Sequence, residues 1–140
     1  MRWRRLERTL IIVKPDAVSR RLTGRILSLF EENDLRVVGV KMIRLSEEQA
    51  GEFYAVHRDK EFYDNLVSYM TSGECVPVAL EGAGAVARVR SLCGDTDPSK
   101  AEKGTVRASY GLSITMNSIH ASDSPDTARR EVGYFFPDLV

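Results

Sequence analysis

Four apolar runs along this chain have the length and composition of β-strands. The predicted strands are 8–14 (RTLIIVK), 35–45 (LRVVGVKMIRL), 74–81 (ECVPVALE) and 112–116 (LSITM). The first run is rich in β-branched residues and stops at Pro15. Pro77 lies inside the third run, and because proline cannot donate a backbone hydrogen bond, it predicts an edge position or a β-bulge for that strand.

The segments between these runs carry apolar residues at helical spacing. They predict helices over 22–32, 61–70 and 83–93, and two further helices that begin at capping residues. Ser46 and Gln49 form a capping-box pattern that opens a helix through about Val56. Ser124, followed by Pro125, opens the last helix. The stretch 94–111 is rich in turn formers and charge, so it predicts a long, ordered, functional loop.

Strands and helices alternate through a chain that has no internal repeat, no low-complexity stretch and no linker. A length of 140 residues fits one domain, 1–140, with a core large enough to be stable. Residues 1–6 are a basic extension of that domain and could be flexible. The alternation predicts an α/β or α+β sandwich in which helices cover one sheet.

Composition narrows the class of protein. Lys plus Arg equals Asp plus Glu, at 20 each, so no overall positive field favours nucleic acid. Cys75 and Cys93 form no zinc-like pattern with the two histidines, which favours a reducing compartment and no resident metal. The N-terminal apolar run is too short for a signal peptide, and no run is long enough to span a membrane. We therefore expect a cytoplasmic protein.

One motif resembles a dinucleotide-binding turn, but the segment that follows it does not support that function. The sequence GAGAVA at 82–87 matches G-x-G-x-x-A, follows a predicted strand and opens a predicted helix. A dinucleotide-binding unit needs another strand soon after that helix, with an acidic residue at its end. Here the helix leads into the turn-rich stretch 94–111, so the motif does not indicate a dinucleotide site.

His120 lies in the polar segment NSIHASDSP, directly before the last helix. On that helix, Glu131 borders the apolar face and needs a partner. An imidazole N–H would satisfy the carboxylate and leave the second ring nitrogen free as a nucleophile or base. The alternative is that His120 is a solvated loop residue and that Glu131 pairs with an arginine. The local sequence supports the two hypotheses about equally.

Basic side chains recur where turns or strand ends would place them. Lys14 ends the first strand, Arg90 is late in a helix, and Arg107 follows Thr96 in the turn-rich stretch. Each alone is most commonly a solvated surface charge. Together, a lysine at a strand end and arginines near an ordered loop are the residue types that bind phosphate.

RTLIIVKPDAV at 8–18, NSIHASDS at 117–124 and the spacing between them resemble nucleoside diphosphate kinase, from about Glu7 to about Phe136. The resemblance implies a ferredoxin-like βαββαβ α+β fold with an antiparallel four-stranded sheet covered by helices. It implies ping-pong transfer of the γ-phosphoryl group of a nucleoside triphosphate to a nucleoside diphosphate through a phosphohistidine, with Mg²⁺ held mainly by the phosphates. It also implies a homo-oligomer, either a tetramer or a hexamer.

The resemblance also assigns roles to single residues. His120 matches the nucleophile, Glu131 the carboxylate that orients it, Ser122 a hydroxyl in the same network and Tyr54 a ring beside it. The positions that match phosphate, sugar and base contacts are Lys14, His57, Phe62, Arg90, Thr96, Arg107, Ile114 and Asn117. Because Phe62 and Ile114 can only stack on the base, broad nucleobase specificity is expected.

One residue departs from the motif: Ala121 stands where members of this family commonly have glycine. An extra methyl group is compatible with function if the local φ is negative. Two other functions are conceivable for such a fold. An RNA-binding sheet would need a run of exposed aromatic residues, which the chain lacks. A catalytically silent relative would have lost the histidine or a phosphate ligand, and none is lost.

Overall fold

The structure is a computed structural model that describes residues 6–140. Its sheet contains β1 (Leu6–Val13), β2 (Arg36–Val40), β3 (Val76–Ala83) and β4 (Ile119–Ala121), in the spatial order β2-β3-β1-β4. Every neighbouring pair is antiparallel. The predicted ferredoxin-like α+β fold is confirmed. The basic extension expected at 1–6 lies outside the described residues except for Leu6, which begins β1.

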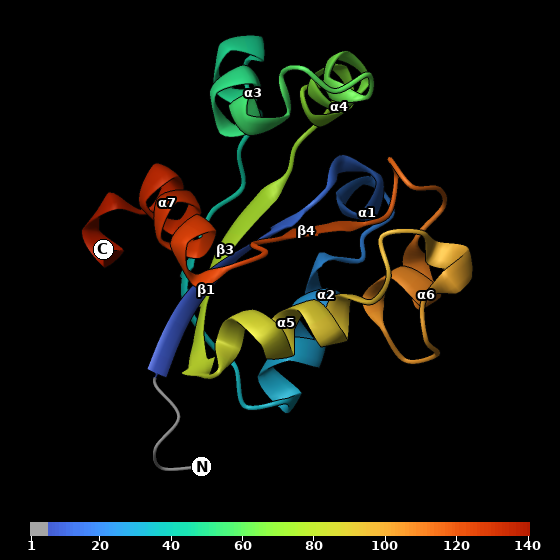
Figure 1. Cartoon of the computed structure of the whole chain (residues 1–140). Helices are drawn as coiled ribbons and strands as arrows, with labels where there is room; N and C mark the ends of the chain where they lie inside the picture. The colour runs from blue at the N-terminus through green and yellow to red at the C-terminus, as the bar shows by residue number, and fades with distance from the viewer. Residues whose placement is uncertain (1–5) are drawn as a thin grey trace.

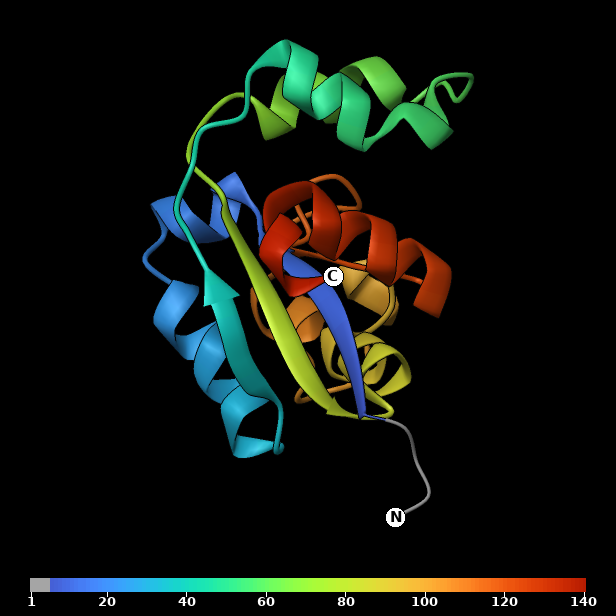
Figure 2. The same cartoon turned by 90° about the vertical axis from the view of Figure 1, so that its left-hand side faces the viewer.

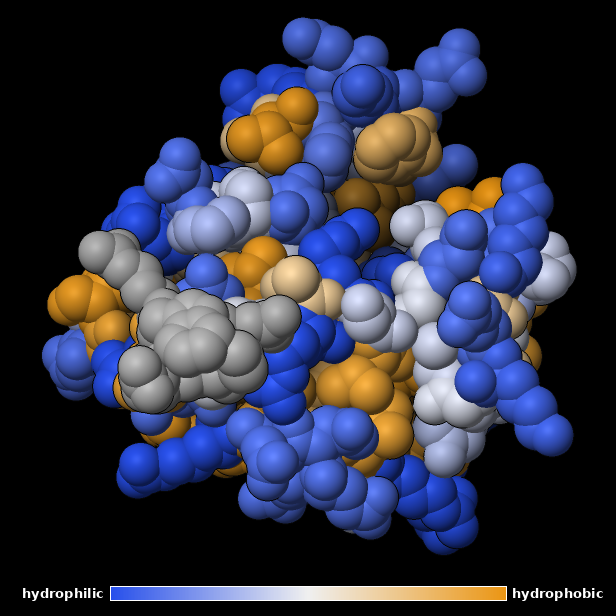
Figure 3. All heavy atoms as spheres, turned by 60° about the horizontal axis from the view of Figure 1, so that its bottom comes forward, coloured by the Kyte–Doolittle hydropathy of each residue, from blue (hydrophilic) through white to orange (hydrophobic). Residues whose placement is uncertain are grey.

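Helices cover both faces of the sheet (Figures 1 and 2). On one face, α2 (Thr23–Glu32) and α5 (Ala85–Cys93) bury a core with alternate residues of β1 and β3. On the other face, α7 (Pro125–Phe135) packs on β1. Figure 3 shows hydrophilic side chains over most of the face near α5 and α2, with smaller apolar areas between them. The helices therefore bury one side and expose the other.

Shorter helices surround one end of the sheet. The helices α3 (Glu47–Phe53) and α4 (Tyr63–Met70) form a hairpin above this end in Figure 1, linked by the 3₁₀ turn Ala55–His57. The remaining elements are α1 (Pro15–Ser19), α6 (Val106–Tyr110) and the 3₁₀ turns Pro98–Lys100 and Pro137–Leu139.

The capping residues behave as expected. Ser46 Oγ accepts from the amide of Gln49, whose side chain accepts from the amide of Ser46. Ser124 Oγ accepts from the amide of Thr127, with Pro125 in the first turn of α7. These caps satisfy amides at the helix starts. The helix that Ser46 opens is shorter than predicted, because α3 ends at Phe53 and the chain then tightens into a 3₁₀ turn.

Two expectations about strands are wrong. The segment 112–116 is a turn closed by a hydrogen bond from the amide of Leu112 to the carbonyl of Met116, and the fourth strand is Ile119–Ala121. The apolar residues of 112–116 are largely exposed, so their alternation does not reflect burial against the sheet.

Pro77 is neither in an edge strand nor at a bulge: β3 pairs with both β1 and β2, and the register shift between β2 and β3 lies at Val37–Gly39. It lies opposite Lys41, just beyond the end of β2, and its carbonyl accepts from the Lys41 amide. The N and O of one strand residue point to the same side, so the missing N–H faces the place where that pairing ends. An internal strand can therefore accommodate this proline at little cost in hydrogen bonds.

Candidate active site

A cavity of about 690 Å³ opens between the α3–α4 hairpin, the ends of β1 and β4, and the stretch 94–117. Residues predicted from the sequence that line it are Lys14, Tyr54, His57, Phe62, Arg90, Thr96, Arg107, Ile114, Asn117, His120 and Glu131. The one predicted site residue outside the lining is Ser122, which is buried and bonded to Glu131. The structure therefore brings side chains from distant parts of the sequence to one cavity.

His120 is held by Glu131. The ring atom Nε2 lies 2.8 Å from Oε1 of Glu131, and Ser122 Oγ donates to the same oxygen at 2.7 Å. Burial alone would raise the pKa of Glu131, but the His120 ring and these two hydrogen bonds outweigh it, so the pKa lies below its ordinary value. An ionised carboxylate can only accept, so Nε2 carries the proton and Nδ1 of the neutral ring keeps its lone pair.

This arrangement follows from strand and helix geometry. In β4, His120 pairs with Ile12 of β1, and its neighbours Ile119 and Ala121 point to the opposite face into the core. Glu131 comes from α7, which packs on β1. The hypothesis that His120 is a solvated loop residue is therefore wrong, since the residue lies in a paired strand and contacts a buried carboxylate.

Two aromatic rings fix the plane of the imidazole. Phe53 and Tyr54 approach His120 edge-on, with ring centroids 5.3 and 5.9 Å away. The hydroxyl group of Tyr54 is buried and has no hydrogen-bond partner within the described residues. Burial, and then the charge of Glu131, raise the pKa of Tyr54, so it remains a neutral donor. A buried hydroxyl without a partner at the wall of a cavity is suited to a ligand atom.

Lys14 and Asn117 form a connected polar pair. Lys14 Nζ donates to Asn117 Oδ1 at 2.9 Å, and Asn117 Nδ2 donates to the carbonyl of Thr96 at 3.0 Å. Lys14 is only 7% exposed. Burial, and next the charge of Arg107, lower the pKa of Lys14 to about 8. An anion in the cavity would offset both effects.

Arg107 is anchored from two sides. Its Nη1 and Nη2 donate to the carbonyls of Gly94 and Ile119, each at 2.8 Å, while the buried Nε has no partner among the described residues. Arg90 is exposed and donates to the carbonyl of Ala121 at 3.1 Å. Burial lowers the pKa of Arg107, yet a guanidinium titrates too high to lose its charge in the physiological range. Of the predicted residues, two guanidinium groups and one ammonium group therefore line the cavity.

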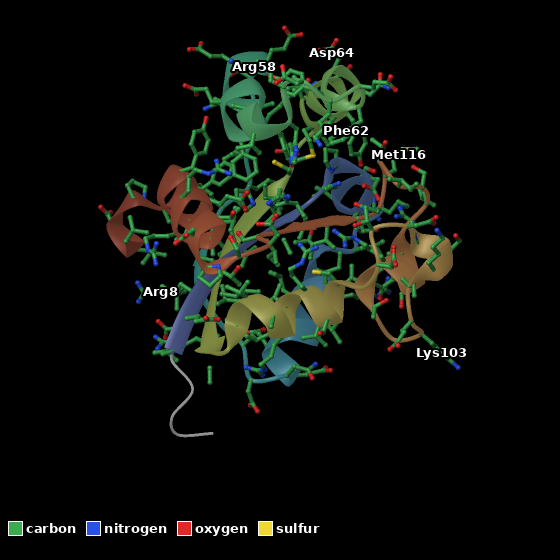
Figure 4. All side chains as sticks on the ribbon, viewed as in Figure 1. Arg8, Arg58, Phe62, Asp64, Lys103 and Met116 are labelled. Carbon is green, nitrogen blue, oxygen red and sulfur yellow. The ribbon has the colours of Figure 1, made fainter. Side chains whose placement is uncertain are left out.

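The outer walls of the cavity are apolar and open. Phe62 is 48% exposed and Ile114 is 60% exposed, and both side chains line the cavity, so a ligand in it would cover them. The ring of His57 lies 5.4 Å from that of Phe62. In Figure 4, Phe62 lies on the lower side of the hairpin, towards the sheet, whereas Arg58 and Asp64 lie on its outer side.

The structure adds lining residues that the sequence did not predict. They are Val56, Leu66, Thr115, Ala121, Asp123, Thr127 and Arg130. Arg130 and Thr127 follow Ser124 on the first turns of α7, so placing that helix start beside His120 could have indicated them. Thr115 lies in the segment predicted as a strand, which obscured its position. Its carbonyl accepts weakly from Lys14 Nζ, at 3.4 Å.

Ala121 fits its backbone without strain. It is absent from the residues with positive φ, which apart from glycines are Arg21, Asp34 and Ser118 in the described chain. The condition set on the extra methyl group is therefore met. Of these three residues, Ser118 is the one close to His120, and it adopts φ +78° between Asn117 and β4.

A ferredoxin-like domain whose cavity combines a carboxylate-bound histidine with four cationic side chains is suited to a polyphosphate substrate. Residues 7–139 match the sequence model of the family described as nucleoside diphosphate kinase. The chain is 55% identical over 130 residues to the nucleoside diphosphate kinase of Acidiphilium cryptum (strain JF-5), covering 93% of each. It is 50% identical over 134 residues to that of Dechloromonas aromatica (strain RCB), covering 96% of this chain and 94% of that protein.

A solved structure agrees with the sequence comparisons. The crystal structure of the Aquifex aeolicus nucleoside diphosphate kinase superposes with a TM-score of 0.94 at 44% identity, covering 96% of this chain and 98% of that one. The chain belongs to the nucleoside diphosphate kinase family and is a phosphotransferase. No helix in residues 6–140 is long and apolar enough to cross a membrane.

Proposed function

We propose that the protein moves the γ-phosphoryl group of a nucleoside triphosphate to a nucleoside diphosphate in two steps through His120. In the first step Nδ1 attacks the γ-phosphorus, the bond to the β–γ bridging oxygen breaks, and the diphosphate leaves. In the second step a terminal oxygen of another diphosphate attacks the phosphorus, and the N–P bond breaks. The observation that carries this proposal is the Glu131 contact to Nε2, which leaves Nδ1 as the free nucleophile.

Glu131 and Ser122 would act through the histidine. When Nδ1 takes the phosphoryl group, the ring becomes cationic, and the carboxylate at Nε2 stabilises that charge. Ser122 keeps the carboxylate in place by its hydrogen bond at 2.7 Å. Tyr54 would donate its free hydroxyl to an oxygen of the transferring group. These roles match the positioning and electrostatic work that phosphoryl transfer requires.

Lys14, Arg90, Arg107 and Thr96 would bind the phosphates. Arg107 is already braced by two backbone carbonyls, so little side-chain entropy is lost when an anion binds. Lys14 is buried with a lowered pKa, and a phosphate beside it would restore the full charge. The cations neutralise charge that develops on the phosphoryl oxygens.

Phe62 and Ile114 would sandwich the base, with His57 near the first phosphate. Neither wall carries a polar side chain that reads a base edge, so binding would tolerate every nucleobase. Lys14 and Asn117 would bind the sugar hydroxyls, since both side chains can hydrogen-bond and both line the same cavity. The sugar would therefore be read more strictly than the base.

Mg²⁺ would enter with the nucleotide. Within the described residues no group of three His, Cys, Asp or Glu side chains could hold a metal ion. Of the side chains around the cavity, Asp123 and Glu131 supply carboxylates, and Glu131 is already bound to His120 and Ser122. The phosphate oxygens of the nucleotide would thus supply most ligands, and the true substrate would be the magnesium complex.

We also propose a cytoplasmic homo-oligomer, a tetramer or a hexamer. In support, β2 is an edge strand, and Val40 and Met42 next to that edge are exposed. Cys75 and Cys93 are both buried free thiols, which suits a reducing compartment.

The central test is direct labelling. Wild-type protein incubated with γ-labelled ATP should carry label that is lost in acid and retained in alkali, as expected of a phosphohistidine. His120→Gln should carry none while its thermal melting is unchanged. His57→Gln, which alters the other histidine, should still be labelled. Label on the His120→Gln variant would refute the proposal.

A further inference from the structure

Asp16 is a buried carboxylate that the proposed reaction does not use. Its side chain is 4% exposed, and its contacts come from α4, from Ser118 and from Arg20 at the end of its own helix, α1. Tyr69 of α4 donates its hydroxyl to Oδ1 and accepts from the Asp16 amide at 2.7 Å. Ser118 Oγ donates to Oδ2 at 3.3 Å, and Arg20 Nη2 donates to Oδ2 at 3.1 Å. A buried charge with this many donors is well compensated.

Two of these partners, Tyr69 and Ser118, lie in segments that carry cavity residues, and the third, Arg20, bonds to a segment that leads to one. Tyr69 lies on α4, and Phe62 occupies the N-cap position of the same helix. Arg20 also donates to the carbonyl of Tyr110, where the segment that carries Ile114 begins. Ser118 follows Asn117, and its carbonyl accepts from the amide of Lys14 at 2.9 Å.

Ser118 gives a second reason to assign importance to this carboxylate. It is fully buried and adopts φ +78°, a conformation that costs energy for any residue other than glycine. The contact from its hydroxyl to Asp16 helps to hold this conformation, which turns the chain from Asn117 into β4.

We propose that Asp16 is a positioning residue for nucleotide binding: through Tyr69, Arg20 and Ser118 it fixes the distance between the Phe62 wall and the Ile114 wall and the place of Asn117. It touches neither the phosphates nor His120. The inference rests on the proposed function, because it assigns those walls to the base and Asn117 to the sugar.

The position of Asp16 predicts which step should be impaired when its contacts with Tyr69, Arg20 and Ser118 are removed. His120 is held by Glu131 from α7, by the pairing of β4 with β1 and by the rings of Phe53 and Tyr54, and none of these groups is hydrogen-bonded to Asp16. Loosening the walls should therefore weaken nucleotide binding and leave the reactivity of the imidazole intact. Phosphoramidate separates these effects, because it transfers its phosphoryl group to an imidazole nitrogen, releases ammonia and has no base or sugar.

The test compares Tyr69→Phe and Asp16→Asn with Tyr63→Phe. Tyr63 lies on the same helix but donates its hydroxyl to the carbonyl of Gly51, inside the hairpin, so it is a matched control. For Tyr69→Phe we expect the KM for ATP and the Kd for ADP to rise at least roughly tenfold, because the hydroxyl loses its hydrogen bond to the carboxylate and the one it accepts from the Asp16 amide. Asp16→Asn should show at least that loss, and Tyr63→Phe should bind as wild type does. In all three, labelling of His120 by phosphoramidate should stay within about twofold of wild type.

The outcomes separate the possible roles. If Tyr69→Phe and Asp16→Asn bind ATP as wild type does, or lose ATP and phosphoramidate reactivity equally, Asp16 does not position the nucleotide walls. If Asp16→Asn fails to fold, Tyr69→Phe decides the question, since it keeps the Asp16 carboxylate and removes only the two hydrogen bonds of the Tyr69 hydroxyl. Failure of the wild-type protein to be phosphorylated by either donor would instead refute the function proposed for His120.

Discussion

Nε2 of His120 and Oε1 of Glu131 lie 2.8 Å apart, although one residue belongs to an edge strand and the other to a helix eleven residues later. The contact fixes the tautomer and the direction of the ring together. Because Glu131 is 4% exposed, water competes little for its oxygens, and the interaction is stronger than a similar pair at the surface.

Replacement of Glu131 by glutamine should slow phosphorylation of His120 without loosening nucleotide binding. The amide keeps the shape but removes the charge, and a charge-assisted hydrogen bond contributes about 1.5–3 kcal/mol. That energy corresponds to roughly one to two decades in rate. Rapid-mixing measurement of phosphoenzyme formation, with nucleotide Kd measured in parallel, checks this result. Glu81→Gln, which alters the pair with Arg8 at 2.9 Å, is the control and should react normally. A normal rate with much weaker binding would contradict the role given to Glu131.

The affinity for nucleotide should fall as pH rises through the pKa of Lys14. In the free protein this pKa is lowered to about 8, first by burial and then by Arg107, with Asp16 opposing the shift. Above that pH the Lys14 side chain of the free protein loses the positive charge that the phosphates need, so kcat/KM should fall with rising pH. At pH 8, binding of ADP should take up protons, which calorimetry in buffers of different ionisation enthalpy measures. Lys14→Met should abolish both effects, and a profile flat to pH 10 in the wild type would oppose the assignment.

The same residue should affect stability with the opposite sign. A lysine whose pKa is lower in the folded state than its unfolded value of 10.5 binds fewer protons when folded. The contribution of Lys14 to the free energy of unfolding therefore rises with pH between about 8 and 10.5. Urea denaturation at both ends of this range should show that increment in the wild type and lack it in Lys14→Met. An equal pH dependence in both proteins would mean that Lys14 is not the group responsible.

Discrimination among bases should be shallow and discrimination among sugars steep. Stacking between Phe62 and Ile114 favours purines through area alone, so ATP, GTP, CTP and UTP should differ by roughly 1–2 kcal/mol. A 3′-deoxy analogue leaves a polar group of the site unpaired and should lose about 1–3 kcal/mol or more. Steady-state kcat/KM over this panel measures both. A thousandfold preference for one base, or full activity with the 3′-deoxy nucleotide, would contradict the proposed walls.

Ala121→Gly should lower stability and leave catalysis unchanged. The residue sits in β4 opposite Ile11, with a negative φ and its methyl group buried in the core. Glycine would add freedom to the unfolded chain at a cost of roughly 0.5–1 kcal/mol. Thermal melting and kcat measured on the same preparation test this expectation. A gain in kcat would show that the methyl group strains the backbone beside His120.

Much of this architecture could be predicted from local patterns. The capping residues Ser46 and Ser124 marked helix starts correctly, because a cap is a short-range interaction between neighbouring residues. The strands β1 and β3 were predicted because their apolar residues face the two cores. The position of Glu131 at the border of the apolar face of α7 similarly indicated a buried carboxylate in need of a partner.

Each failed prediction has a physical reason that lies outside the local sequence. Leu112, Ile114 and Met116 are apolar and alternate as a strand does, yet they lie in an exposed turn, and Ile114 lines the cavity. A pattern of hydrophobicity cannot separate burial by the protein from burial by a ligand. Pro77 was assigned to an edge or a bulge because local rules ignore where the neighbouring strand ends. The Asp16 cluster was missed since its partners are spread from Tyr69 to Ser118 and share no local pattern.

The three-residue length of β4 restricts how this chain can change in evolution. Side chains alternate across a strand, so deletion of one residue between Asn117 and His120 would put the core residue Ala121 in the place of the imidazole. The stretch 94–116 contains no strand in which side chains must alternate. Residues added to its turns would raise the entropic cost of closing the loop only slowly. Insertions and deletions should therefore accumulate ahead of Asn117, while the few residues that follow keep a fixed count.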